Sequence, residues 1–293
     1  SGVVTATVDE GDIATLAGLT DTGNALTITV TDSSVDAAAL NVLNGKTTEV
    51  LTVNSTIVTG ALSDIKAAYD ANNATTPTIT GLGNENITVT NTGTVSASDL
   101  NDLNGLSIGV VTVSSATTVT GSFADITTLY AANNAGTVTG LGDEVIQVSD
   151  GNALTTANLD ALDALTTGIV SVTVSDESQT ASSLNALDAS ASEAINASTI
   201  TTLTGAAADI NTSYASDGIT GLGDEAVTLS DTTLTASTLS TLNENTTGVI
   251  DASTVTTLTG TADEISTILA SDGITFGAEV GATISDTSIA ASA

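Results

Sequence analysis

Carboxylates gather at two kinds of place in this sequence, and together they could bind calcium. The first is a turn of sequence Gly-Leu-Gly-Asp-Glu, found at residues 140–144 and again at residues 221–225. The second is a series of acids that follow strand-like runs. Calcium takes about six to eight oxygen ligands from carboxylates, backbone carbonyls and water, and glycine turns beside acids offer such oxygens. The candidate ligands are Asp143, Glu144, Asp150, Asp224, Glu225, Asp231 and Asp286.

A structural interpretation of the same residues stays open beside the calcium hypothesis. In this interpretation the glycines make a tight turn, and each Asp or Asn after a strand accepts backbone hydrogen bonds in an Asx-turn or as a helix cap. Every strand end needs such a partner, whether or not a metal is bound. The two interpretations differ in one respect, because only a metal site loses stability when calcium is chelated.

Catalysis is not expected of this chain. It contains no His and no Cys, so an ordinary pair of nucleophile and base is missing. The adjacent acids Asp143 and Glu144 would point to opposite faces of a strand, which does not suit the paired carboxylates of a glycosidase. The motif also recurs along the chain, whereas an active site is usually single. We therefore predict a protein that is not an enzyme.

The charge balance argues against several classes of partner. The 293 residues include 34 acids and only two lysines, which gives a net charge of −32. Nucleic acids and anionic membrane surfaces are bound through basic patches, so neither is an expected partner. No apolar run has the length of a membrane span, and membrane insertion is not predicted. Hydrophobic residues still make up 41% of the chain, which favours a folded protein over a disordered one.

The acidic turns belong to a repeat that extends along the chain. Four Thr-Gly dipeptides, with glycines at positions 60, 121, 205 and 260, each precede apolar residues at the second, fifth and ninth positions that follow. This spacing places the apolar residues on one face of a helix. An acid always occupies the fourth position, and the wider gap between Gly121 and Gly205 indicates an extra half-unit. These acids are Asp64, Asp125, Asp209 and Glu264.

Three of the ninth positions hold tyrosine, at Tyr69, Tyr130 and Tyr214. A tyrosine on the apolar face of a short helix typically buries its ring and keeps its hydroxyl hydrated. We expect these side chains to pack in the core or at the helix edge, with the hydroxyl group reaching water.

Runs rich in Val, Ile and Thr alternate with the helices and predict strands. Strands separated by short helices are expected to pair in parallel. A second helix signature, Leu-x-x-Leu, recurs between them. We therefore predict an α/β repeat solenoid with a parallel sheet on one side and short helices on the other, wound right-handed with about eleven rungs. A pure parallel β-helix is the alternative, because Thr-rich turns could replace some helices.

The domain organisation follows from the same register. Residues 1–293 are predicted to form a single continuous solenoid that is a segment of a longer chain or of a polymeric assembly. The approximate repeats span residues 26–86, 87–145, 146–226, which contain the extra half-unit, and 227–293.

The repeat style resembles that of a known group of proteins. Residues 246–263 read Thr-Thr-Gly-Val-Ile-Asp-Ala-Ser-Thr-Val-Thr-Thr-Leu-Thr-Gly-Thr-Ala-Asp, and elsewhere the repeat includes an Ile-Thr-Gly-Leu-Gly link and a Leu-Ser-Asp strand end. This combination resembles repeats of giant secreted cell-surface proteins of marine cyanobacteria, of the type associated with swimming in Synechococcus. The likeness extends from about Val3 to Ile284. It implies an extracellular or cell-surface location in an attached or shed polymer, and it implies no catalytic residues.

Taken together, these patterns predict a non-enzymatic structural protein that forms an acidic extracellular rod, filament or surface-layer element. The open ends of a solenoid expose unpaired strand edges, so the expected partners are further copies joined end to end or neighbouring repeats of the same chain. The alternative is a calcium-stiffened adhesin or glycan-binding module. Ca²⁺ is the sole cofactor that the residues suggest.

Overall fold

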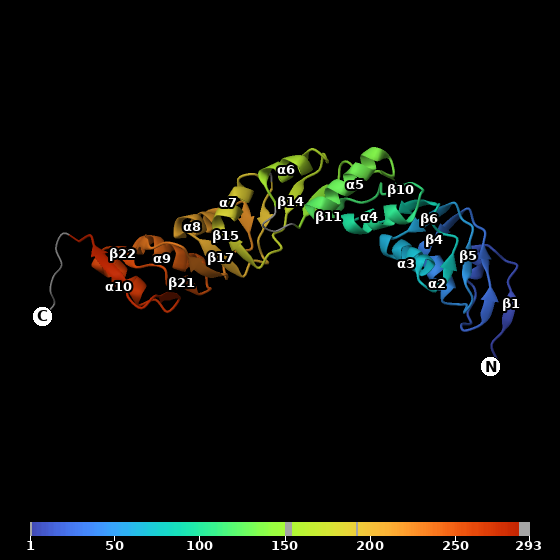
Figure 1. Ribbon diagram of the computed structural model, residues 1–293, viewed down its shortest axis with the longest axis horizontal. Helices are drawn as coiled ribbons and strands as arrows, with labels where there is room; N and C mark the ends of the chain where they lie inside the picture. The colour runs from blue at the N-terminus through green and yellow to red at the C-terminus, as the bar shows by residue number, and fades with distance from the viewer. Residues whose placement is uncertain (1, 150–153, 192, 287–293) are drawn as a thin grey trace. The chain divides into compact units, whose positions relative to one another are not determined.

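The computed structural model describes residues 2–149, 154–191 and 193–286, in which short strands alternate with short helices (Figure 1). Contacts within the chain divide it into two compact units. Unit 1 consists of Ser1–Gln147 together with Leu162–Ile169, and unit 2 consists of Val148–Ala161 together with Val170–Ala293. Helix α6 (Thr156–Asp163) and strand β13 (Val145–Val148) therefore contribute residues to both units.

Unit 1 starts with short strands and a single-turn helix and then repeats an order of strand, strand and helix. After every second helix one additional strand is inserted. Its elements are β1 (Thr5–Thr7), α1 (Ile13–Leu16), β2 (Ala25–Thr27), β3 (Thr29–Val30), β4 (Ser34–Asp36), α2 (Ala37–Asn44), β5 (Leu51–Val53), β6 (Ile57–Gly60), α3 (Leu62–Asn73), β7 (Ile79–Thr80), β8 (Asn86–Val89), β9 (Thr94–Ser96), α4 (Ala97–Leu106), β10 (Val111–Thr112), β11 (Thr118–Gly121), α5 (Phe123–Ala135) and β12 (Val138–Thr139).

Unit 2 follows the same order of elements. In this unit α7, α8 and α9 follow one another beside strands β15, β17 and β21 (Figure 1). Its elements are β14 (Val170–Val172), β15 (Ser178–Thr180), α7 (Ala181–Asp188), β16 (Ile195–Asn196), β17 (Thr202–Gly205), α8 (Ala207–Ala215), β18 (Ile219–Thr220), β19 (Ala226–Leu229), β20 (Thr233–Thr235), α9 (Ala236–Asn245), β21 (Ile250–Ala252), β22 (Thr257–Gly260), α10 (Ala262–Leu269), β23 (Ile274–Phe276) and β24 (Gly281–Ile284).

The strands of unit 1 pair in parallel and place like residues over like residues. Strands β4, β6, β8, β10 and β12 form one five-stranded sheet. Within it Val58 lies between Val35 and Ile87, and Val111 lies between Ile87 and Val138. All five side chains are at most 1% exposed. The buried core is thus a stack of branched residues, one from each strand.

The strands of unit 2 repeat this arrangement. Strands β15, β17, β19, β21 and β23 form a parallel sheet, and β20, β22 and β24 form a second one. Val227 lies between Leu203 and Ile250, and Ile274 continues the same row. The predicted α/β repeat with parallel strands is confirmed. Because helices recur throughout, the pure β-helix alternative does not describe the chain. The predicted right-handed winding and number of rungs stay predictions.

The strands are distributed among several small sheets, and strands β8 and β19 show how the pairing changes between layers. Strand β8 pairs on one edge with β6, which directly precedes a helix, and on the other edge with β10, which directly follows one. Strand β19 connects β17 and β21 in the same way. Each of these strands begins just after a glycine-rich turn. The glycine-rich turn therefore lies where strand pairing changes from strands that precede a helix to strands that follow one. This change occurs once in every two helices.

The helices form where the sequence places caps and apolar residues at helical spacing. Asp36 accepts the N–H of Ala39 at 3.0 Å, and Ser122 and Thr235 cap α5 and α9 in the same manner. Both leucines of each Leu-x-x-Leu signature are buried in α2, α4, α7 and α9. One prediction from the repeat is wrong. The ninth position after Gly260 was expected on the buried face of its helix, but Leu269, which occupies this position at the end of α10, is 49% exposed.

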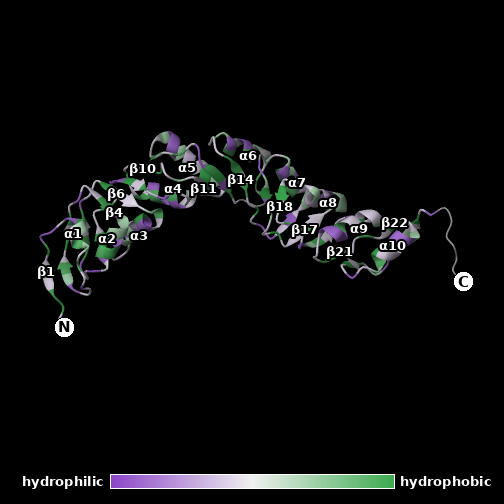
Figure 2. Ribbon diagram, turned by 180° about the vertical axis from the view of Figure 1, so that it is seen from behind, coloured by the Kyte–Doolittle hydropathy of each residue, from purple (hydrophilic) through white to green (hydrophobic). Residues whose placement is uncertain are grey.

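Figure 2 shows that the helices of unit 2 carry both hydrophilic and hydrophobic residues, as expected for helices with one buried face. Within the three described ranges, none of the helices combines the length and the hydrophobicity that crossing a membrane requires.

Three glycines allow the backbone to approach the glycine-rich turns closely. A Cβ atom at Gly109 would lie 2.1 Å from the carbonyl oxygen of Glu85. Equivalent contacts would occur at 2.3 Å between Gly168 and Glu144, and at 2.1 Å between Gly248 and Glu225. The neighbour is backbone in each case, so it cannot rotate away. Glycine is therefore required wherever the chain passes a turn glutamate.

We predict that Gly109→Ala lowers the free energy of unfolding by roughly 2 kcal/mol or more, because two backbone segments must separate. Gly105→Ala is the matched control in the neighbouring helix α4, where a Cβ would meet nothing within 4 Å. It should leave stability unchanged or raise it by up to about 1 kcal/mol, because alanine favours a helix. Urea unfolding followed by circular dichroism measures both, and equal effects would contradict the close approach.

Candidate functional site

Three glutamates at the ends of the glycine-rich turns are buried, each at most 2% exposed. Each carboxylate accepts a hydrogen bond from a tyrosine hydroxyl on the preceding helix. We expected the tyrosine hydroxyl groups to reach water. This expectation is wrong, because each hydroxyl donates to a carboxylate instead. The pairs are Tyr69–Glu85 at 2.9 Å, Tyr130–Glu144 at 3.0 Å and Tyr214–Glu225 at 2.8 Å.

Backbone and hydroxyl groups complete each pair into what we call a Tyr–Glu cluster. In the first cluster the N–H of Gly83 donates to the Glu85 carboxylate at 2.8 Å, which closes the turn. The hydroxyl of Ser107 donates to the main-chain oxygen of Glu85 at 2.7 Å and accepts the N–H of Gly109 at 3.0 Å. The other two clusters repeat these bonds with Gly142, Thr166 and Gly168, and with Gly223, Thr246 and Gly248.

A fourth copy of the repeat shows that the two side chains depend on each other. At the position equivalent to the tyrosines stands Leu269, and at the position equivalent to the glutamates stands Val280. The buried carboxylate thus occurs in the copies that provide a tyrosine hydroxyl. A buried charge without donors is strongly unfavourable, which accounts for the joint loss. This joint occurrence of Tyr and Glu was the sequence signal for the pairing.

The clusters make the tyrosines harder to ionise. Burial raises the pKa of Tyr69 well above its usual value, and the negative charge of Glu85 adds to the effect. Burial likewise raises the pKa of Tyr130, beside Glu144, and of Tyr214, although a hydrogen bond from Thr246 partly offsets the rise at Tyr214. A tyrosinate would meet both a dry environment and a neighbouring carboxylate.

This raised pKa predicts a loss of stability at high pH. The contribution of the tyrosines is complete below the unfolded-state pKa of about 10 and falls as the pH rises above it, because the unfolded chain then releases protons that the folded chain retains. The chain contains only three tyrosines, so tyrosinate absorbance reports on the clusters alone. We expect this absorbance to appear together with the loss of circular dichroism, in one cooperative step.

The control for this titration is Tyr69→Phe, which deprives Glu85 of a donor and should cost about 1–3 kcal/mol at neutral pH. Tyrosines that ionise one by one near pH 10 in a protein that is still folded would contradict the cluster.

Acids and amides at the strand ends make a second recurring interaction. Each accepts a backbone N–H in the first turn of a helix that lies earlier in the chain. The side chain therefore caps a helix of a neighbouring layer and not the helix that follows it. The four pairs, each at 2.8 Å, are Asp32 with Ile13, Asn91 with Leu62, Asp231 with Ala207 and Asp286 with Ala262.

The structure places the predicted calcium ligands in separate environments. Glu144 and Glu225 are in the buried clusters, Asp231 and Asp286 cap helices, and Asp143 and Asp224 are exposed at the turns. Asp150 lies outside the described residues. Across the part of the chain that the structure describes, no three acidic side chains come together as metal ligands would. The capping interpretation is supported by these contacts, and calcium binding stays a hypothesis.

Two substitutions distinguish these interpretations of the strand-end acids. Asp231→Ala removes the cap of α8 and should lower stability by about 0.5–2 kcal/mol. Asp224→Ala removes the same charge from an exposed turn and should change stability by less than about 0.5 kcal/mol. Melting temperatures with calcium and with EGTA provide the measurement. We expect the difference between the variants to be equal in both, whereas a difference seen only with calcium would support a metal site.

The lysine of α3 makes an ion pair between helices. Its ammonium group lies 2.5 Å from the carboxylate of Asp99 and 3.3 Å from that of Asp102, both on α4. The hydrogen bond to Asp99 raises the pKa of Lys66 above its usual value. This ion pair therefore links α3 to α4.

Comparison with known proteins finds no family model, no curated protein and no solved structure that matches this chain. The resemblance to cyanobacterial surface repeats thus stays a prediction from the sequence, and the geometry alone carries the functional argument.

Proposed function

We propose that this chain is a non-enzymatic structural protein whose repeats build an acidic rod, filament or surface-layer element outside the cell, and that further copies or repeats join it end to end. The observation that carries the proposal is the repeated parallel pairing within each unit. A fold in which every strand is extended by an equivalent strand can continue to grow, because each added layer buries the apolar row of the layer before it.

The terminal strands support association along the same direction. Strand β24 pairs with β22 and is the last strand of its sheet within the described residues. All four of its residues are exposed, including Ile284 at 43%. Strand β1 is likewise a terminal strand, exposed along Thr5–Thr7 beside Val3 at 69% and Val4 at 54%. Free strand edges with exposed apolar side chains recruit another strand.

The charge of the chain favours end contacts over side contacts. With a net charge of −32, two parallel copies would repel each other along their whole length. An end contact brings fewer charges together, and salt screens them over about 8 Å at physiological ionic strength. A saline exterior is consistent with such a protein, which is why the proposal places it at the cell surface or beyond.

The test is the state of association of the full chain as concentration rises. We expect sedimentation velocity to show growing species in physiological salt, and electron microscopy to show that they lengthen without thickening. Ile284→Lys puts a charge on the free edge of β24 and should reduce growth at least about tenfold. The matched control is Val42→Lys, where the replaced side chain is 57% exposed on helix α2 and not on a strand.

Growth that responds equally to both lysines would contradict association through β24. A chain that stays monomeric at every concentration would contradict association between copies altogether.

A further inference from the structure

The last layer of unit 2 exposes side chains at positions that other repeats bury. Ile284, the last residue of β24, is 43% exposed, whereas the last residues of the equivalent strands β8 and β19, Val89 and Leu229, are at most 2% exposed. Leu269 on α10 is 49% exposed at the position where Tyr69 on α3 is fully buried. Apolar rows that are closed elsewhere in the chain are therefore open here. We call this surface, which includes Leu269 and β24, the open end of unit 2.

The strands equivalent to β24 show what covers such an end. Strand β8 is covered by β10, which follows helix α4, and β19 is covered by β21, which follows helix α9. Both helices carry the Leu-x-x-Leu signature with its two leucines buried. Within the described residues, β24 pairs with β22 alone. In both precedents the covering element is therefore a Leu-x-x-Leu helix and the strand after it, which we call a Leu-x-x-Leu layer.

A short motif between the helix and the strand fixes each of these layers in place. The hydroxyl of Ser107 donates to the main-chain oxygen of Glu85 at 2.7 Å, and the hydroxyl of Thr246 donates to that of Glu225 at 2.8 Å. Two residues later a glycine passes the same oxygen, where a Cβ atom would lie only 2.1 Å away. The acceptor belongs to the main chain, so any residue at this position provides it. At the open end this residue is Val280.

The sequence at this point of the repeat indicates the same type of layer. Residues 285–292 read Ser-Asp-Thr-Ser-Ile-Ala-Ala-Ser, and residues 230–237, which lead into α9, read Ser-Asp-Thr-Thr-Leu-Thr-Ala-Ser. Helices of the other type follow a Thr-Gly dipeptide, which residues 285–292 do not contain. The repeat pattern therefore favours a Leu-x-x-Leu layer as the element that fits the open end.

We propose that the open end of unit 2 binds a Leu-x-x-Leu layer whose helix and strand are joined by Ser or Thr, any residue and glycine. The helix packs on α10, as α4 packs on α3 and α9 on α8. The hydroxyl donates to the main-chain oxygen of Val280, and the strand pairs with β24 and covers Ile284. This inference rests on the function proposed above, because it specifies which kind of layer extends the stack.

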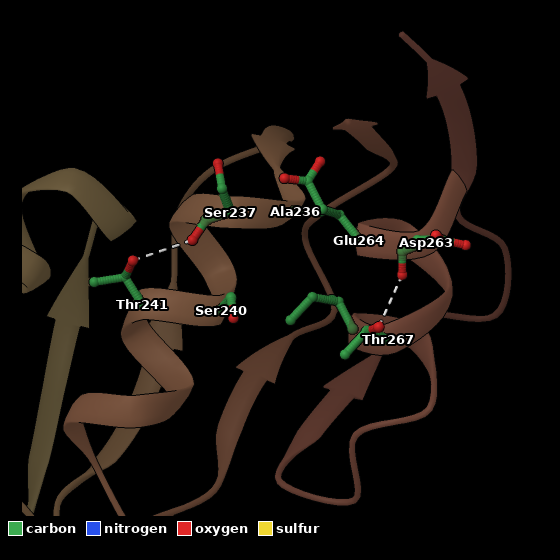
Figure 3. Close-up of a pocket in the computed structure, with 8 residues that line it drawn as sticks. Ala236, Ser237, Ser240, Thr241, Asp263, Glu264 and Thr267 are labelled. Atoms are coloured by element: carbon green, nitrogen blue, oxygen red, sulfur yellow. Dashed lines mark hydrogen bonds between the residues drawn. The ribbon is translucent and has the colours of Figure 1, made fainter. Parts of the chain in front are cut away.

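The test extends the full chain by one such layer. A copy of residues 239–252, which contains the two leucines, the glycine motif and β21, is appended after Ala293. One variant carries Gly248→Ala within the appended copy, which puts a Cβ atom where the main chain must approach closely. The matched control carries Thr241→Ala within the copy. Thr241 is exposed, and its hydroxyl bonds the carbonyl of Ser237 within its own helix (Figure 3).

The measurement is amide hydrogen exchange at Ala282, because its equivalents Ile87 and Val227 donate their N–H groups to the covering strand at 2.9 Å. We expect the extension to slow this exchange at least about tenfold, and the Thr241→Ala copy to do the same. The Gly248→Ala copy should lose most of this protection.

An extension that gives no protection, or equal protection by the two variants, would overturn the proposal. Exchange is measured at concentrations where sedimentation shows single chains, so that association cannot protect β24. The proposed function is tested separately, by the association of unextended chains, and each result can fail without the other.

Discussion

Parallel pairing in strict register is the constraint on which the rest of this structure depends. It places each buried side chain over its equivalent in the next strand, as with Val35, Val58 and Ile87. The core therefore consists of rows of side chains and not of one central cluster. The chain has no disulfide to restrain it. Its stability therefore comes from many small layers that each bury a few branched side chains on the next one.

The register also explains where buried polar groups can exist. A stack of layers brings a helix, a turn and a following strand to the same place in every repeat. A carboxylate that accepts a tyrosine hydroxyl in one repeat can accept one again in the next, as Glu85 and Glu225 do from Tyr69 and Tyr214. The cluster tightens the turn at which β8 and β19 change partners. Buried hydrogen bonds of this kind cost little when complete and a great deal when one donor is missing.

Departures from the repeat show which positions depend on one another. Most positions are constrained by the layers on both sides, so a substitution is tolerated only where the neighbours permit it. The last copy is an example, because Leu269 and Val280 stand there in place of a tyrosine and a glutamate. A buried carboxylate and its hydroxyl donor are therefore gained or lost together.

The sequence alone determined the class of fold, the parallel direction of the strands, and the positions of most helices. It could do so because periodic apolar residues and strand-end acids recur at fixed spacing, as Leu40 and Leu43 illustrate. Tertiary structure alone decided the partners of the polar groups. Glu144 looked like a metal ligand in the turn, yet it accepts from Tyr130, and Asp231 caps a helix in another layer. Such partners are distant in the chain, and only folding brings their atoms within hydrogen-bonding distance.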